Sequence, residues 1–200
     1  MLEPKDPKVH KKLDMKQVFD KKLRWMTLGG QYDWTRKVYP AEVPPEFPKD
    51  VADLIRGICP WMEPQAAIVN VYSPGDTLSL HRDVSEEVDA GLVSISLGSD
   101  CLFMIGTGDG SSEDGYQFRT IRLHSGDVVF MEGPARFAWH GVPKIIPDTC
   151  PTGLSEWPSD SKLELFPQWA GWMKNKRINL NVRQMREIGL TDGTATQLAQ

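Results

Sequence analysis

The sequence has few cysteines, and their spacing excludes the common cysteine-built sites. Cys59, Cys101 and Cys150 are an odd number and form no C-x-x-C pair. They favour neither a disulfide framework nor a structural zinc site, and they fit a reducing compartment. The chain also lacks an apolar run long enough to span a bilayer, and its first residues lack the apolar core of a signal peptide. We therefore expect a soluble protein with no membrane partner.

A strong net charge is also missing, so the composition alone does not identify a nucleic-acid-binding protein. The formal net charge is −4 at pH 7. Basic residues nevertheless gather in the first segment: Lys5, Lys8, Lys11, Lys12, Lys16, Lys21, Lys22 and Arg24. Such a face could follow a phosphate backbone, although a solvated helix face is the simpler explanation.

Short alternating segments separated by Gly and Pro predict a mainly β fold in one domain. We expect strands at residues 66–72, 78–82, 92–97, 101–105, 117–123, 127–131, 135–139 and 177–183. We expect helices at residues 6–21, from Lys49 to just before Pro60, and at 162–174. Short strands at this spacing indicate a sandwich or barrel rather than alternating α/β units.

Aromatic residues gather close to the N-terminus. Residues 23–39 predict a β-hairpin with a glycine pair at its turn, and this segment contains Trp25, Tyr32 and Trp34 among cationic side chains. Aromatic rings beside cations suit a flipped-out or single-stranded base. Cross-strand packing of the same rings is an equally good explanation.

One short motif suggests a metal site. His81 and Asp83 stand two residues apart at the end of a predicted strand, so their side chains share a face. Two histidines and one carboxylate form the facial site of non-haem Fe(II) oxygenases, which leaves one histidine to find. His140 lies in the β-rich region and is favoured over His10 and His124. By itself the motif also fits a surface histidine next to a solvated aspartate.

The last predicted strand carries polar side chains at every second position. Arg177, Asn179, Asn181 and Arg183 therefore share one face. Burying two guanidinium groups is costly without an anion, and guanidinium binds carboxylates in a bidentate manner. The alternative is the exposed face of an edge strand. Together with the metal motif, a dicarboxylate cosubstrate is the better interpretation.

Four motifs occur in an order that resembles one known family. They are Asn70-x-Tyr72, His81-x-Asp83, the later His140, and Arg177-x-Asn179-x-x-x-Arg183. This series resembles the AlkB family of Fe(II)/2-oxoglutarate dioxygenases over residues 23–184. The segments 23–27, 124–127 and 179–184 look most like its eukaryotic first-homologue branch.

The resemblance implies a fold and a set of site residues. The fold is a double-stranded β-helix (jelly roll) with flanking helices and an N-terminal nucleotide-recognition lid. The implied iron ligands are His81, Asp83 and His140. The implied 2-oxoglutarate site contains Asn70, Tyr72, Arg177, Asn179 and Arg183. The implied substrate contacts are Trp25, Tyr32, Trp34 and Ser85.

The same resemblance gives an expected division of the chain. Residues 1–60 would form the N-terminal helix, lid hairpin and supporting helix. Residues 61–186 would form the catalytic core, with an insertion at 148–175. Residues 187–200 would be a polar tail of the same structural domain.

The implied activity is oxidative demethylation of N-methylated adenine in nucleic acid, releasing succinate, CO₂ and formaldehyde. The substrate would be N6-methyladenine in unpaired DNA or N1-methyladenosine in tRNA, with Fe(II), 2-oxoglutarate and supporting ascorbate. Ser85 replaces the acidic residue of the bacterial pattern, so the bacterial alkylation-repair preference does not carry over. We expect a monomer in the nucleus or mitochondrion, or in the cytoplasm. The alternatives are 5-methylcytosine in tRNA, a protein substrate, or a non-catalytic nucleic-acid-binding module.

Overall fold

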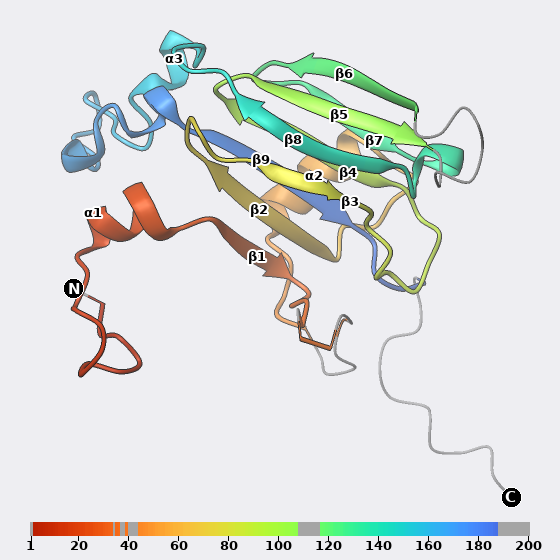
Figure 1. Cartoon of the computed structure of the whole chain (residues 1–200), viewed down its shortest axis with the longest axis horizontal. Coiled ribbons are helices and arrows are strands. Elements are labelled where there is room, and N and C mark those ends of the chain that lie inside the picture. Colours follow the sequence, from red (N-terminus) through yellow and green to blue (C-terminus); the bar gives the residue numbers. More distant parts are fainter. Residues whose placement is uncertain (1, 34, 37–38, 40–43, 108–116, 188–200) are drawn as a thin grey trace, which may run out of the picture.

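The computed structural model describes residues 2–33, 35–36, 39, 44–107 and 117–187, and its main feature is two facing antiparallel sheets (Figure 1). The larger sheet has the order β1 (Trp25–Gly29), β2 (Ala66–Tyr72), β9 (Arg177–Arg183), β4 (Leu92–Gly98), β7 (Val128–Met131). The smaller has the order β3 (Leu78–His81), β8 (Trp139–Ile145), β5 (Cys101–Thr107), β6 (Gln117–Leu123). The mainly β prediction is confirmed.

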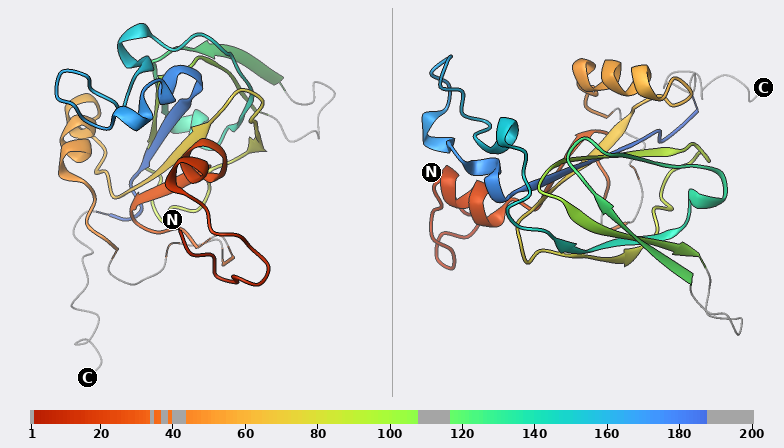
Figure 2. Two further views of the ribbon diagram at one scale, coloured as in Figure 1. Left: turned by 90° about the vertical axis from the view of Figure 1, so that its left-hand side faces the viewer. Right: turned by 90° about the horizontal axis from the view of Figure 1, so that it is seen from above.

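Helix α2 (Lys49–Ile58) covers the outer face of the larger sheet (Figure 2, right). Its fully buried Ile55 packs in a cluster with Ala67, Val93 and Val182 from three central strands. Alternate residues of those strands point the other way, toward the smaller sheet. The apolar face of β9 therefore meets α2, while its polar face lies between the sheets.

Replacing Ile55 by Ala should lower the free energy of unfolding by about 2–4 kcal/mol, because it leaves a cavity under α2. Leu54 is the matched control, since it is in the same helix but 55% exposed. Leu54→Ala should change the free energy of unfolding by no more than about 0.5 kcal/mol. Urea unfolding measures both variants, and equal losses would contradict the packing described for α2.

The N-terminal predictions are wrong in two places. Helix α1 covers only Met15–Gln17 and continues as the π-helical turn η1 (Val18–Lys22), so residues 6–14 are not helical. Among the described residues of 23–39, only Trp25–Gly29 forms a named strand, β1, and its partner is β2 rather than the second half of a hairpin. The Asp33 carboxylate accepts hydrogen bonds from the backbone N–H groups of Thr35 and Arg36, which makes a turn where the second strand was expected.

The strand expected at residues 135–139 is also misplaced. Gly133–Ala135 forms the 3₁₀ turn η2, and the strand β8 begins only at Trp139, so that His140 lies near its start. This strand contains Gly141, where a side-chain carbon would approach the Leu78 carbonyl oxygen to 2.8 Å. The close approach of β3 therefore requires glycine at this position. Because glycine is usually taken to interrupt a strand, the sequence pattern placed the strand wrongly.

The insertion at residues 148–175 packs against the N-terminal segment, and the two lie side by side (Figures 1 and 2). It forms α3 (Thr152–Ser155) and the 3₁₀ turns η3 (Pro167–Trp169) and η4 (Trp172–Asn175), in place of the helix expected at 162–174. The ring of Phe19 lies 5.4 Å from that of Trp169 and 6.3 Å from that of Trp172.

No helix in the described ranges is both long and apolar enough to cross a membrane. Strand β1 lies in the expected N-terminal region yet is hydrogen-bonded into the larger sheet. The boundary at residue 60 stays a prediction. Most of the polar tail expected at 187–200, and the lid residue Trp34, lie outside the described residues.

Candidate functional site

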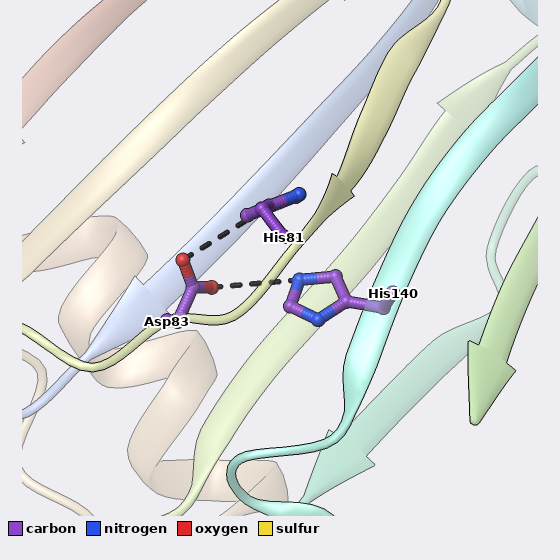
Figure 3. A group of neighbouring side chains, drawn as sticks. All are labelled: His81, Asp83 and His140. Carbon is purple, nitrogen blue, oxygen red and sulfur yellow. Dashed lines mark ion pairs between the residues drawn. The ribbon is translucent and has the colours of Figure 1, made fainter. Parts of the chain in front are cut away.

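Two adjacent strands of the smaller sheet, β3 and β8, bring together three side chains that could bind a metal. His81 ends β3 and stands opposite His140 of β8 in the strand register, and Asp83 follows two residues after His81. Their donor atoms all lie within 4.8 Å of one another. His81 Nε2 is 3.9 Å from one Asp83 oxygen and His140 Nε2 is 3.6 Å from the other, as Figure 3 shows. The structure thus brings His140, rather than His10 or His124, next to His81 and Asp83.

Both imidazoles have their ring nitrogens arranged for metal binding. His81 Nδ1 lies 2.9 Å from the Ser79 carbonyl oxygen, and His140 Nδ1 lies 3.0 Å from that of Ala138. A carbonyl only accepts, so each Nδ1 carries the hydrogen and each Nε2 presents a lone pair to the site. Burial, and then the neighbouring His140, lowers the pKa of His81, which favours the neutral ligand form.

The Asp83 carboxylate is held in its charged form. Burial alone would raise its pKa, but the neighbouring His140 and the charge of Arg183 lower it below the ordinary value. Arg183 Nη2 lies 2.8 Å from Asp83 Oδ2, and Asn181 Nδ2 donates to the same oxygen at 3.2 Å. Two neutral imidazoles and one carboxylate are a donor set that suits Fe(II).

A cavity of about 490 Å³ opens beside these ligands, between the two sheets. Besides the three ligands it is lined by Asn70 of β2 and by the polar face of β9, namely Arg177, Asn179, Asn181 and Arg183. All four β9 residues are buried and β9 is central in its sheet, which excludes the alternative of an exposed edge strand.

Arg177 is a buried cation whose hydrogen-bonding capacity is largely unused. It is 1% exposed, and its Nη2 donates to Ser96 Oγ at 2.9 Å. Its Nε and Nη1 have no partner in the described part of the chain, and neither does the buried hydroxyl of Tyr72. The Arg177 guanidinium carbon lies 5.3 Å from the centre of the Tyr72 ring.

The Tyr72 hydroxyl stays protonated and can donate a hydrogen bond, because burial raises its pKa to about 12. A buried guanidinium without a counter-ion is costly, so the donors of Arg177 and Tyr72 call for an anion. A carboxylate accepts several hydrogen bonds at once and matches the planar guanidinium. The residues therefore fit the distal carboxylate of a dicarboxylate such as 2-oxoglutarate.

The predicted substrate contacts are only partly brought together. Tyr32 and Ser85 line the cavity, and the Ser85 hydroxyl donates to the Tyr32 hydroxyl at 2.9 Å. Trp25 lies on β1, is 46% exposed and does not line the described cavity. Its proposed place in a lid and that of Trp34 stay predictions.

Some residues that shape the site were not among the predicted site residues. Asn181 belongs to the period-two pattern of β9, but the 2-oxoglutarate site implied by the resemblance did not include it. Ser94 and Ser96 of β4 hold the side chains of Asn179 and Arg177, and they also alternate along their strand. No sequence pattern indicates that Glu86 or Arg136 belongs to the site, although both side chains are buried beside the cavity.

The whole described core corresponds to one family model. Residues 2–183 match the model described as the 2OG-Fe(II) oxygenase superfamily. A solved structure, "The structure of OsALKBH1", shares the fold at a TM-score of 0.62 and 24% identity, over 80% of this chain and 77% of the other. The jelly-roll architecture is thereby confirmed.

Curated relatives from fungi are more similar in sequence. The "N6-methyladenosine RNA demethylase ALKBH" of Cryphonectria parasitica is 58% identical, over 92% of this chain and 85% of the relative. The protein of the same activity named ALKB1 in Pyricularia oryzae is 57% identical, over 92% and 54%. The "tRNA demethylase abh1" of Schizosaccharomyces pombe is 46% identical, over 88% and 57%. The chain thus spans little more than half the length of two of these relatives.

Proposed function

Because the chain belongs to the 2OG-Fe(II) oxygenase superfamily, and within it to the AlkB family, we propose that it is an Fe(II)- and 2-oxoglutarate-dependent demethylase of N-methylated adenine in nucleic acid. The observation that carries this proposal is the meeting of two features in one cavity. One is the His81, Asp83 and His140 donor set, and the other is the unpaired guanidinium of Arg177. The first suits Fe(II) and the second suits a carboxylate.

In this proposal the chain's own residues bind and orient the cosubstrate. Arg177 and Tyr72 hold the distal carboxylate, while Asn70 and Asn179 line the walls beside it. Arg183, next to Asp83, lies near the end that meets the metal. Bound iron with 2-oxoglutarate and O₂ would supply the oxidation of the methyl group, with succinate, CO₂ and formaldehyde as products; ascorbate would keep the iron reduced in vitro.

The base would enter on the side of Tyr32 and Ser85, which line the cavity and would contact the substrate. The N-terminal region, with Trp25 and Trp34, would form the lid. A base reaches such a cavity most readily from single-stranded, looped or mismatched nucleic acid, because unpairing then costs least.

Among substrates we place N6-methyladenosine in RNA first, because two of the relatives that are more than half identical carry that name. N1-methyladenosine in tRNA is second, in view of the fission-yeast tRNA demethylase. N6-methyladenine in unpaired DNA has the same reacting group. We further propose that the enzyme acts as a monomer in the nucleus or mitochondrion, or in the cytoplasm.

Mass spectrometry of methyl loss tests this function. Three oligonucleotides would be incubated with iron, 2-oxoglutarate and ascorbate: an N6-methyladenosine RNA, an N1-methyladenosine tRNA stem-loop and an N6-methyladenine bubble DNA. We expect the RNA to lose its methyl group fastest, with one formaldehyde for each succinate. Succinate without methyl loss from any of the three would show that the substrate is another one, such as 5-methylcytosine in tRNA or a protein. The absence of succinate would instead indicate a non-catalytic binding module.

A further inference from the structure

Four buried charged side chains form a chain of ion pairs that begins at the metal-ligand carboxylate. Asp83 pairs with Arg183, whose Nη1 donates to one Glu86 oxygen at 3.0 Å. Arg136 Nη2 donates to the other Glu86 oxygen at 2.7 Å. The signs alternate along this row, so each charge has a partner of opposite sign.

The outer half of this row is more deeply buried than the metal site itself. The side chains of Glu86 and Arg136 are each 1% exposed. Removing one member of a buried pair leaves an uncompensated charge, which is far more costly than losing a surface pair. A buried ion pair of this kind fixes the positions of the groups that its members contact. Here Glu86 contacts Arg183, and Arg136 contacts the backbone carbonyl of Asp83, so both contacts lie next to the proposed iron site.

Arg136 also holds the loop that carries the carboxylate. Its Nη1 donates to the backbone carbonyl of Asp83 at 2.8 Å, and its Nε donates to that of Ala90 at 2.7 Å. It therefore fastens both ends of the segment 83–90, which connects β3 to β4 and has no regular structure. Arg136 lies four residues before His140 in the sequence. Its side chain therefore connects the loop that carries Asp83 to the segment that leads into the strand of His140.

We propose that Glu86 and Arg136 are positioning residues that hold the Asp83 carboxylate ready for the metal. This inference rests on the proposed function, since it assumes that Asp83 binds the metal. Glu86 occupies one nitrogen of Arg183 and balances its charge. Without it, Arg183 would have Asp83 as its one acidic partner among the described residues, and the guanidinium would compete with the metal for that carboxylate.

The first test is the affinity of Glu86→Gln for Mn(II), measured by calorimetry without any turnover. Glutamine keeps the shape and one acceptor but loses the charge. We expect binding about ten- to a hundredfold weaker than that of the unsubstituted chain, the range typical for outer partners of metal ligands. Mn(II) is the probe because it is a divalent cation that does not oxidise readily during the titration.

Asp100→Asn is the matched control. The Asp100 side chain is likewise buried, at 6% exposure, and its carboxylate accepts two hydrogen bonds from Arg122, yet it does not line the cavity. Both variants should lose stability in urea, but Asp100→Asn should bind Mn(II) as the unsubstituted chain does. A role of Glu86 in folding alone would make the two variants alike in metal affinity, and that result would overturn the inference.

Arg136→Lys provides a second variant that keeps the charge. One ammonium group does not reproduce the fork that reaches Glu86, Asp83 and Ala90 together, so Mn(II) binding should again weaken. Tight binding by both Glu86→Gln and Arg136→Lys would refute the positioning role and leave the proposed function standing. An unsubstituted chain that binds no Mn(II) would overturn the proposed function and this inference with it.

Discussion

Asp83→Ala should reduce iron-dependent turnover to the level of the reaction without enzyme, while the two sheets stay folded. The substitution removes one of the three proposed ligands, and it removes the one that is negatively charged. The fold should survive because Arg183 keeps Glu86 as an acidic partner at 3.0 Å. Succinate release measures the activity, and circular dichroism in the near and far ultraviolet measures the fold.

Asp100→Ala is the control for this loss. It deletes a buried carboxylate with an arginine partner from the same fold, at a place that does not line the cavity. We expect it to lose stability and to keep turnover at a temperature well below its unfolding transition. Undiminished turnover by Asp83→Ala, under conditions in which Asp100→Ala is also active, would remove Asp83 from the ligand set.

Arg177→Ala should raise the concentration of 2-oxoglutarate needed for half-maximal turnover by about a hundredfold, the equivalent of roughly 3 kcal/mol. The physical reason is the loss of two guanidinium nitrogens without hydrogen-bond partners, in a buried guanidinium that lies beside the Tyr72 ring. Turnover at saturating 2-oxoglutarate should fall much less, since Arg177 is not a metal ligand. Initial rates over a range of 2-oxoglutarate concentrations separate the two effects.

A cosubstrate without the distal carboxylate makes this test specific. The unsubstituted enzyme should prefer 2-oxoglutarate strongly over 2-oxobutyrate, whereas Arg177→Ala should lose most of that preference. Arg122→Ala, which removes an arginine outside the cavity, should keep it. If Arg177→Ala had the same apparent affinity for 2-oxoglutarate as the unsubstituted enzyme, the guanidinium would not be the carboxylate partner.

Parts of the site that repeat along one strand could be predicted from the sequence. The strand at residues 177–183 has the predicted bounds, and its period of two places Arg177 and Arg183 on one buried face. The motif order also identified the family, which the family model and the relatives confirm. These features are local, so the alternation of side chains is enough to reveal them.

Other parts depend on contacts between distant segments. Strand β1 pairs with residues 66–70. Nothing in the sequence of residues 23–39 indicates that this distant strand is the partner rather than the neighbouring half of a hairpin. Arg136 reaches the Asp83 carbonyl from 53 residues away, so neither its burial nor its role follows from a neighbouring pattern. The strand β8 was misplaced because Gly141 and Pro143 resemble breakers, although the glycine is needed for the close approach of β3.

The most direct test of the proposed site is the position of a bound metal. In crystals grown with Mn(II) and 2-oxoglutarate, anomalous scattering would locate the ion and the electron density would locate the cosubstrate. We expect one strong peak in contact with His81 Nε2, His140 Nε2 and an Asp83 oxygen, and a dicarboxylate that reaches from that peak to Arg177. A peak bound elsewhere, or a cosubstrate that does not reach Arg177, would contradict the assignment of this cavity as the site of an iron- and 2-oxoglutarate-dependent reaction.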